Sequence, residues 1–252
     1  HRDLHSFPTR RSSDLLKKAS AVVISSQRGA AELKKKYPFV KNLSVVQDGI
    51  NLDFLSSTKN SRPDPKTNLE LETIRAWKKE SRLLIYAGGL SPAKGLKDFF
   101  FFFGQHFSLQ DGWKLLVFGQ GPEKETYQKE SEKNGWQDKI FLAKNHGYFQ
   151  LPFYLNLADA AIDPKKNSTE SSGKLPLYMA ASLPILCFEN SFNQTKLGPH
   201  GLYFQNWTDL KNILLNNQLV QKPIIYNLEN LDNQTEIEKL EKIFLEIIGA
   251  SH

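Results

Sequence analysis

The sequence predicts an α/β protein built on a parallel sheet whose two faces are covered by helices. Short apolar runs alternate along the chain with segments of helical spacing. Strands buried on both faces read as continuous apolar runs, and their regular alternation with helices is typical of parallel sheets. Ligands bind beyond the carboxyl ends of such strands, so the loops after Ala87, Phe118, Leu142 and Ile162 are candidate sites.

The composition describes a globular chain with a basic surplus. The 252 residues are 40% hydrophobic and 24% charged, with a net charge of +6. That surplus suits an anionic ligand or is solvated surface, and no known aromatic–basic module for nucleic acid is present. A single cysteine, Cys187, excludes a disulfide framework and a cysteine-built metal site. Apolar runs all fall short of the roughly 18 residues that a membrane-spanning helix needs.

The first fifteen residues carry a separate signal. The letters HRDL at positions 1–4 open like a kinase catalytic loop, but Pro8 stands where that loop needs a metal-holding asparagine. The whole stretch from His1 to Leu15 matches the translation of a common sequencing-adapter oligonucleotide. We therefore expect residues 1–15 to be an artefact and the remainder to be a piece of a larger protein.

Two strands, a helix and a linker come first. The apolar runs Ala21–Ser25 and Leu43–Val46 predict buried strands on either side of a helix at Gln27–Lys36. The polar segment Ser56–Asn68 contains two prolines and predicts a linker, and Leu69–Lys79 has helical spacing. The linker separates this part from a longer and more regular series.

A regular series of strands and helices follows the linker. Strands are predicted at Arg82–Ala87, Lys114–Phe118, Ile140–Leu142, Ala160–Ile162 and Pro184–Phe188. Helices are predicted at Leu96–Phe107, Glu123–Asn134, Gln150–Leu157, Lys174–Ala181 and Thr208–Asn217. A last helix starts at the capping box Thr235-x-x-Glu238 and runs to Gly249 with one apolar face.

Three loops of this series place small residues next to a helix start. In Gly88–Gly95 the glycines let backbone N–H groups approach an anion, and Lys94 adds a positive charge. Gly119–Pro122 resembles half of a dinucleotide fingerprint, and without the third glycine it also fits an ordinary turn. Ser168–Lys174 again suits a phosphate, with Glu170 as an acceptor for sugar hydroxyls or as a solvated loop carboxylate.

Taken in order, these stretches resemble one family. The succession GGLSPAKG, GQGPE, LPFYLNLADAAIDP and SSGKLPLYMAASLPI resembles the C-terminal domain of family 4-type glycosyltransferases, which have the glycosyltransferase B fold. The earlier stretch LSVVQDGIN resembles the end of that family's N-terminal domain and the turn into its linker. The resemblance implies a Rossmann-like parallel-sheet domain, truncated at the N-terminus. It also implies transfer of a sugar from a nucleotide diphosphate sugar, with retention at the anomeric carbon.

The resemblance further implies a domain plan and a set of partners. Residues 16–55 would be the remnant of an N-terminal acceptor domain, 56–80 the linker region, 81–230 the donor-binding domain and 231–252 a C-terminal helix. The nucleotide sugar is the donor substrate, with no further cofactor and no metal, since basic side chains do the cation's work. The acceptor is an unidentified glycan or lipid-linked molecule, as in polysaccharide biosynthesis. The expected location is the cytoplasm, with peripheral contact to the inner membrane face left open, and the fragment alone is expected to be inactive.

Residue by residue, the resemblance assigns two catalytic positions and a set of donor contacts. Lys94 matches the lysine that neutralises the leaving diphosphate, where a fixed cation stabilises the transition state more than the ground state. Glu170 approximates the first acid of the family's E-x7-E motif, which contacts the sugar. The positions that match donor contacts are Gly88, Gly89, Ser91, Gly119, Gly121, Asn145, His146, Gly147, Ser171, Ser172, Gly173 and Lys174.

Two positions depart from the family pattern. The family usually has arginine just before the L-S-P-x-K-G segment, where this chain has Gly89, and an acid where it has Leu177. Lys174 is a candidate for part of the missing charge. These departures keep a second hypothesis open, a non-catalytic module that binds a nucleotide sugar or a partner. A plain dinucleotide-binding domain is disfavoured, because its second strand should end in an acidic residue and this one ends in Phe118 and Gly119.

One run of residues fits neither hypothesis directly. Phe99–Phe103 places five phenylalanines in succession within a predicted helix. Successive helical residues point about 100° apart, so the five rings cannot all face one core. Two interpretations stay open: a crowded helix between the sheet and neighbouring loops, or a surface that covers another domain, a partner or a membrane.

Overall fold

The computed structural model describes residues 10–47, 49–52, 61–144, 146–166, 172–216, 223–228, 231 and 233–249. These residues fall into two compact units. The smaller unit contains the described residues up to Ile50 and those after position 229, and the larger unit contains those from Asn51 to Leu228. No helix among the described residues is long and apolar enough to cross a bilayer.

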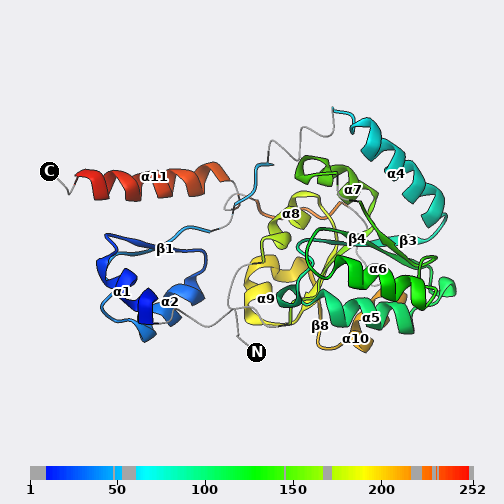
Figure 1. The fold of residues 1–252 in the computed structure, drawn as a ribbon, viewed down its shortest axis with the longest axis horizontal. Helices are drawn as coiled ribbons and strands as arrows, with labels where there is room; N and C mark the ends of the chain where they lie inside the picture. The colour runs from blue at the N-terminus through cyan, green and yellow to red at the C-terminus, as the bar shows by residue number, and fades with distance from the viewer. Residues whose placement is uncertain are drawn as a thin grey trace. The chain divides into compact units, whose positions relative to one another are not determined.

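The larger unit is built on a six-stranded parallel sheet with the strand order β5-β4-β3-β6-β7-β8 (Figure 1). Its strands are β3 (Arg82–Ala87), β4 (Trp113–Phe118), β5 (Ile140–Leu142), β6 (Ala160–Asp163), β7 (Ile185–Phe188) and β8 (Gly201–Phe204). Its helices are α4 (Pro65–Lys78), α5 (Leu96–His106), α6 (Lys124–Lys133), α7 (Leu151–Leu157), α8 (Lys174–Ala180), α9 (Ser191–Leu197) and α10 (Trp207–Leu215). Short 3-10 turns lie at η1 (Pro92–Lys94), η2 (Leu109–Asp111), η3 (Tyr148–Gln150) and η4 (Gly198–His200). The parallel α/β class predicted from the sequence is confirmed.

Chain order reverses in the middle of this sheet, between β3 and β6. The strands β3, β4 and β5 extend towards one edge, and β6, β7 and β8 extend towards the other. At the junction, Leu84 lies opposite Ala160 and Ile85 lies opposite Ala161. In open parallel sheets such a reversal creates a crevice outside the carboxyl ends of the strands, which is where ligands bind. The topology therefore points to the loops that follow β3 and β6.

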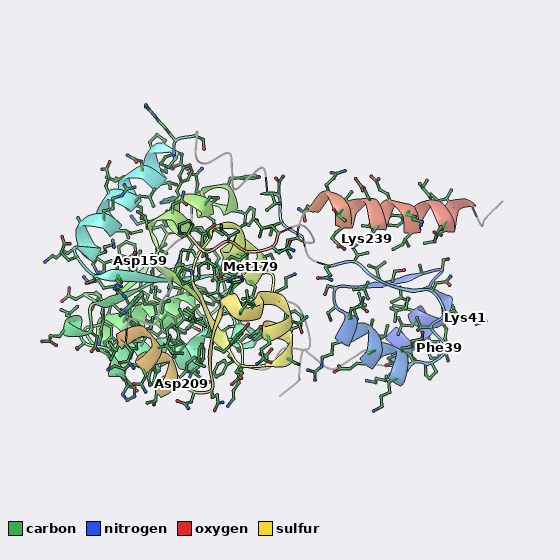
Figure 2. All side chains as sticks on the ribbon, turned by 180° about the vertical axis from the view of Figure 1, so that it is seen from behind. Phe39, Lys41, Asp159, Met179, Asp209 and Lys239 are labelled. Atoms are coloured by element: carbon green, nitrogen blue, oxygen red, sulfur yellow. The ribbon has the colours of Figure 1, made fainter. Side chains whose placement is uncertain are left out.

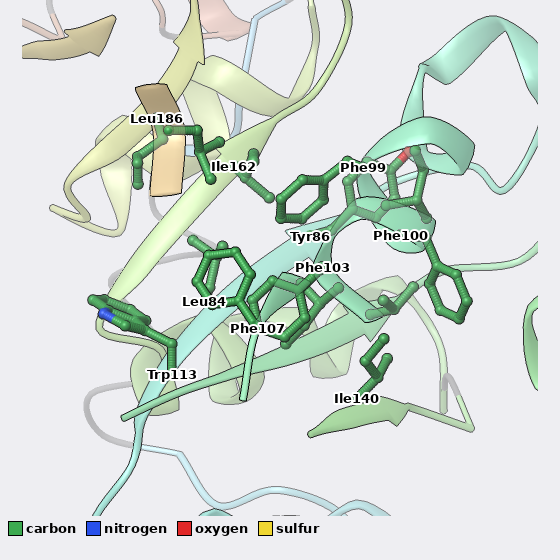
Figure 3. Close-up of a cluster of buried hydrophobic side chains, with 14 of the residues drawn as sticks. Leu84, Tyr86, Phe99, Phe100, Phe103, Phe107, Trp113, Ile140, Ile162 and Leu186 are labelled. Carbon is green, nitrogen blue, oxygen red and sulfur yellow. The ribbon is translucent and has the colours of Figure 1, made fainter. Parts of the chain in front are cut away.

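The helix with five phenylalanines packs inside the larger unit. The helices α5, α6 and α10 lie on one face of the sheet, and α4, α7 and α8 lie on the other (Figure 1). Phe99, Phe100 and Phe103 have no exposed surface and join alternate sheet residues such as Leu84 and Tyr86 in one core (Figure 3). The remaining two rings of the run are partly buried against the same core. This packing favours the crowded helix over a surface reserved for a partner or a membrane.

The start of α4 differs from the sequence prediction. The helix begins at Pro65, where a linker was expected, and its residues Leu71 and Ile74 are buried in the larger unit. Proline suits the first helical position because its missing N–H would have no partner there. Asp64 then caps the helix by accepting the backbone N–H of Thr67 at 2.8 Å. The two prolines therefore lead into a helix and do not extend a linker.

Two short elements near the end of the sheet were missed by the pattern. α9 and β8 follow β7 and are separated from each other by η4. Each is short, and the Gly198-Pro199 pair between them reads as an ordinary loop in the sequence. The structure also extends β6 by one residue, to Asp163. Met179 of α8 is buried within this unit, as the side-chain view shows (Figure 2).

The smaller unit combines four short elements, which enclose a small core, with one long helix, α11. Its elements are α1 (Arg10–Lys18), β1 (Val22–Ile24), α2 (Gln27–Lys36), β2 (Leu43–Val45) and α11 (Asn233–Gly249). The strands β1 and β2 pair in parallel. A core cluster of Leu33, Tyr37 and Val40 holds this part together. α1 includes the last residues of the adapter-like stretch 1–15. Leu15, the final residue of that stretch, is 69% exposed. The artefact assignment stays a prediction.

Candidate functional site

The loops after β3 and β4 interlock at the carboxyl end of the sheet. The backbone N–H of Leu90 donates to the carbonyl oxygen of Gln120 at 2.8 Å. In return, the carbonyl oxygen of Leu90 accepts the N–H of Glu123 at 3.1 Å. These bonds fix the backbone of both loops before any ligand arrives.

The glycines of the second loop are required by this packing. A methyl group placed on Gly119 would overlap the carbonyl oxygen of Gly88. One placed on Gly121, whose φ of 155° already favours glycine, would overlap the carbonyl oxygen of Leu90. The G-x-G pattern is therefore explained by the contact between two loops, and a phosphate ligand is not needed to account for it.

Two lysine side chains flank the consecutive glycines after β3. Lys174, the first residue of α8, packs the carbon chain of its side chain against Gly88. A methyl group on that glycine would lie 3.1 Å from Lys174 Cδ. Lys94, in η1, lies beside Gly89, with its Cε 3.9 Å from the position of a methyl group there. Lys94 is exposed, whereas Lys174 is only 9% exposed. The structure thus brings together four positions that the sequence predicted from separate stretches.

The ammonium of Lys174 is held by a buried carboxylate. Its Nζ lies 3.1 Å from Asp163 Oδ1 at the end of β6, and it donates to Ser172 Oγ at 3.4 Å. Removing one partner of such a buried pair is expected to destabilise a protein by about 3–5 kcal/mol, because the other charge is left uncompensated. Asp163 was missed at the sequence level, where the strand was expected to end at Ile162. The sequence feature that could have identified Asp163 is an acidic residue directly after an apolar run.

Two buried tyrosines shape the same region. The hydroxyl of Tyr86, the residue before the end of β3, donates to the carbonyl oxygen of Gly89 at 2.8 Å. The hydroxyl of Tyr178 on α8 accepts the backbone N–H of Ala87 at 2.8 Å. Burial, reinforced by the negative charge of Asp163, raises the pKa of Tyr86 far above its ordinary value. Tyr86 therefore stays protonated and remains a hydrogen-bond donor at neutral pH.

The loop after β5 is tied to the first helix of the larger unit through Glu70. This buried carboxylate accepts the backbone N–H of Lys144 at 2.9 Å and the hydroxyl of Tyr154 at 2.6 Å. His146 Nε2 lies 3.2 Å from Glu70 Oε2, the oxygen that also accepts the Tyr154 hydroxyl, but without the alignment of a hydrogen bond. The predicted donor contact His146 thus belongs to a cluster around Glu70 that anchors its loop. Gly147 follows with a φ of 108°, a value that favours glycine.

The remaining predicted positions divide into two groups. Ser91 precedes η1, and Gly173 precedes α8, so both lie at the loops described above. Asn145, Glu170 and Ser171 lie outside the described residues. Their assignments stay predictions.

A cavity of about 510 Å³ opens elsewhere, at the edge strand β5. It lies between α4 and α6, with Trp77, Phe141 and Lys124 in its lining. Neither of the two lysines beside the glycines lines it. We place the candidate site at the strand reversal and not at this cavity, because the charged groups and glycines converge at the reversal.

Solved structures with the same architecture define the class of fold. The pneumococcal O-GlcNAc transferase GtfA, in complex with UDP and GlcNAc, is 14% identical, with a TM-score of 0.67, and the match covers 95% of this chain and 47% of that one. HepE of Anabaena, in complex with UDP and glucose, is 14% identical, with a TM-score of 0.73 and coverage of 94% and 66%. A sucrose-phosphate synthase from Thermosynechococcus elongatus is 16% identical, with a TM-score of 0.70 and coverage of 95% and 61%. This chain therefore has the glycosyltransferase B architecture and spans about half to two thirds of the length of these structures.

The family follows from the sequence itself. The model of the glycosyl transferases group 1 family matches residues 69–201, which is more than half of the chain. The chain belongs to this family, which confirms the glycosyltransferase resemblance. No curated protein matches the sequence.

Proposed function

We propose that this chain is the nucleotide-sugar-binding part of a glycosyltransferase that transfers its sugar with retention to a glycan or lipid-linked acceptor. The observation that carries the proposal is the pair of lysines beside Gly88 and Gly89, at the point where strand order reverses. Two structures with the same fold hold UDP, so UDP is the first donor fragment to test.

The two lysines would act on the diphosphate of the donor. When the glycosidic bond breaks, negative charge grows on the leaving diphosphate, and a fixed cation stabilises that state more than the bound donor. Lys94 is exposed and can approach the phosphates, while Lys174 is held in one place by Asp163. Glu170 would contact the sugar. In this proposal the donor needs no metal or separate cofactor, since the cationic work falls to side chains.

A second candidate is a module that binds the donor without catalysis. Leu177 stands where the family usually has the acid that holds the ribose, and it is apolar and only 6% exposed. It cannot supply that contact. Turnover of a nucleotide sugar by the intact protein would separate the two candidates. The chain by itself is expected to transfer sugar poorly, because a closed cleft is needed to exclude water from the reaction.

Lys94→Ala tests the diphosphate assignment. We expect the variant to bind UDP more weakly by roughly 1.5–3 kcal/mol, the range for a hydrogen bond to a charged group, while its affinity for uridine is unchanged. Calorimetric titration with uridine, UDP and UDP-glucose measures the difference. Glu170→Ala should instead spare UDP and weaken only the sugar-bearing donor.

Lys129→Ala serves as the control for general electrostatics, since this lysine is exposed on α6. It should leave all three affinities unchanged. Equal losses for uridine and UDP in Lys94→Ala would show that Lys94 is not a phosphate ligand. If wild-type protein binds none of UDP, GDP and ADP, the donor-site proposal is wrong.

A further inference from the structure

The peptide unit between Gly89 and Leu90 is held at both ends. Its carbonyl oxygen accepts the hydroxyl of Tyr86 at 2.8 Å, and its N–H donates to the carbonyl oxygen of Gln120 at 2.8 Å. A peptide fixed at both ends cannot rotate, so the orientation of the glycine loop is set by these two bonds. One of the two comes from a side chain that lies within the core.

The N–H groups of the two glycines differ in their partners. The N–H of Gly88 donates to the carbonyl oxygen of Phe118 at 3.0 Å. Within the described ranges, the N–H of Gly89 has no acceptor. Gly88 lies against Lys174 and Gly89 beside Lys94, so this N–H is a backbone donor that the loop can offer to an anion near the two lysines. This N–H belongs to the neighbouring peptide unit, between Gly88 and Gly89. That unit shares the Gly89 Cα with the unit that Tyr86 holds, so movement of the held unit would also displace this N–H.

The ring of Tyr86 contacts the second part of the site. Lys174 Nζ lies 5.4 Å from the centroid of this ring, within the range of a cation–π interaction. A methyl group on Gly88 would lie 3.2 Å from the Tyr86 hydroxyl and 3.1 Å from Lys174 Cδ, so the three groups are packed around one point. Tyr86 itself has no exposed surface and cannot contact a ligand.

We propose that Tyr86 is a positioning residue of the donor site, which aims the Gly89 backbone and the Lys174 ammonium at the donor diphosphate. The inference rests on the proposed function and adds a residue to it. Its ring belongs to the hydrophobic core (Figure 3), but the hydroxyl is a separate group with a separate partner. Tyr86→Phe removes only that hydroxyl and keeps the ring.

Tyr203→Phe is a matched control. The hydroxyl of Tyr203, on β8, also donates to a glycine carbonyl, that of Gly198 at 2.6 Å, but it lies outside the β3 loop. The Tyr203 hydroxyl also lies 3.5 Å from the carbonyl oxygen of Asn193. Each variant removes one tyrosine hydroxyl that donates to backbone carbonyl oxygen, so each should lower thermal stability by a small amount. We expect Tyr86→Phe alone to weaken UDP binding, by about 3- to 10-fold, the range for one net hydrogen bond. Its affinity for uridine should change less than about twofold, because uridine lacks the phosphates that the Gly89 backbone and Lys174 would contact.

The outcomes separate this inference from the proposed function. Unchanged UDP affinity in Tyr86→Phe, with normal binding by wild-type protein, would leave the proposed function standing and reject the positioning role. Equal losses for UDP and uridine would also reject it, since a phosphate-specific effect is required. Failure of wild-type protein to bind UDP, GDP or ADP would reject both. A loss confined to UDP in Tyr86→Phe, absent in Tyr203→Phe, would support the inference.

Discussion

The two glycine-bearing loops at the carboxyl end of the sheet look alike in sequence and differ in what their glycines do. In the loop after β4, Gly119 and Gly121 leave room for backbone atoms of the other loop. In the loop after β3, a methyl group on Gly89 would meet only Lys94, at 3.9 Å. In the loop after β4 both glycines are required by packing, whereas in the loop after β3 Gly89 leaves open space beside two lysines. A glycine pattern alone does not distinguish these uses.

Gly119→Ala should have the largest effect on stability. The added methyl group would overlap the carbonyl oxygen of Gly88, and this backbone atom cannot move aside as the end of a flexible side chain could. We expect a loss of about 3 kcal/mol in the free energy of unfolding, the upper end for overpacking. Urea denaturation monitored by tryptophan fluorescence measures it. A loss below about 1 kcal/mol would mean that the two loops are not packed as described.

Gly88→Ala should have an intermediate effect. Its methyl group would lie 3.1 Å from Lys174 Cδ and 3.2 Å from the Tyr86 hydroxyl, so two side chains must shift slightly. We expect a stability loss of about 1 kcal/mol, at the low end for overpacking. UDP binding should weaken in the same variant, because both displaced groups serve the proposed phosphate site. Full UDP affinity together with lost stability would count against that site.

Gly89→Ala should have the smallest effect on folding. Its φ lies outside the left-handed region, and the nearest atoms to an added methyl group belong to the exposed side chain of Lys94. We expect the free energy of unfolding to stay within about 0.5 kcal/mol of wild type, as for a surface substitution. The same urea titration checks this value. A loss as large as that of Gly119→Ala would remove the distinction between the two loops.

Much of the fold follows from the pattern of apolar runs, because buried parallel strands leave a clear signal. The predicted strand Arg82–Ala87 and helix Gln27–Lys36 have the same bounds in the structure. α9 was missed because its sequence SFNQTKL is mostly polar, and β8 because its four residues GLYF directly follow the loop-like segment Gly198–His200. The helix start at Pro65 was missed because proline was interpreted as a breaker when it occupied the first helical position.

The site was harder to predict because its members come from separate strands. Lys94 and Lys174 were identified from loops and from the family resemblance, and the structure places both beside the same pair of glycines. Tyr86 was not identified because it lies within an apolar strand pattern, and Asp163 was not identified because the predicted strand ended one residue earlier, at Ile162. Ser182 was missed for a different reason. Nothing in its residue type indicates a left-handed backbone, yet it adopts a φ of 55°, which glycine would adopt more readily.

The reversal of strand order between β3 and β6 also bears on how the chain folds. The strands β3, β4 and β5 can each form beside the previous one, and so can β6, β7 and β8. Contact between these two halves of the sheet, β3–β5 and β6–β8, requires closure of a long loop, which is entropically unfavourable and slow. Gly88 belongs to the first half and Lys174 to the second, so the proposed diphosphate site exists only after the halves have joined. A nucleoside diphosphate would then bind the complete sheet and no partly folded form, and its presence would draw the folding equilibrium towards the joined state.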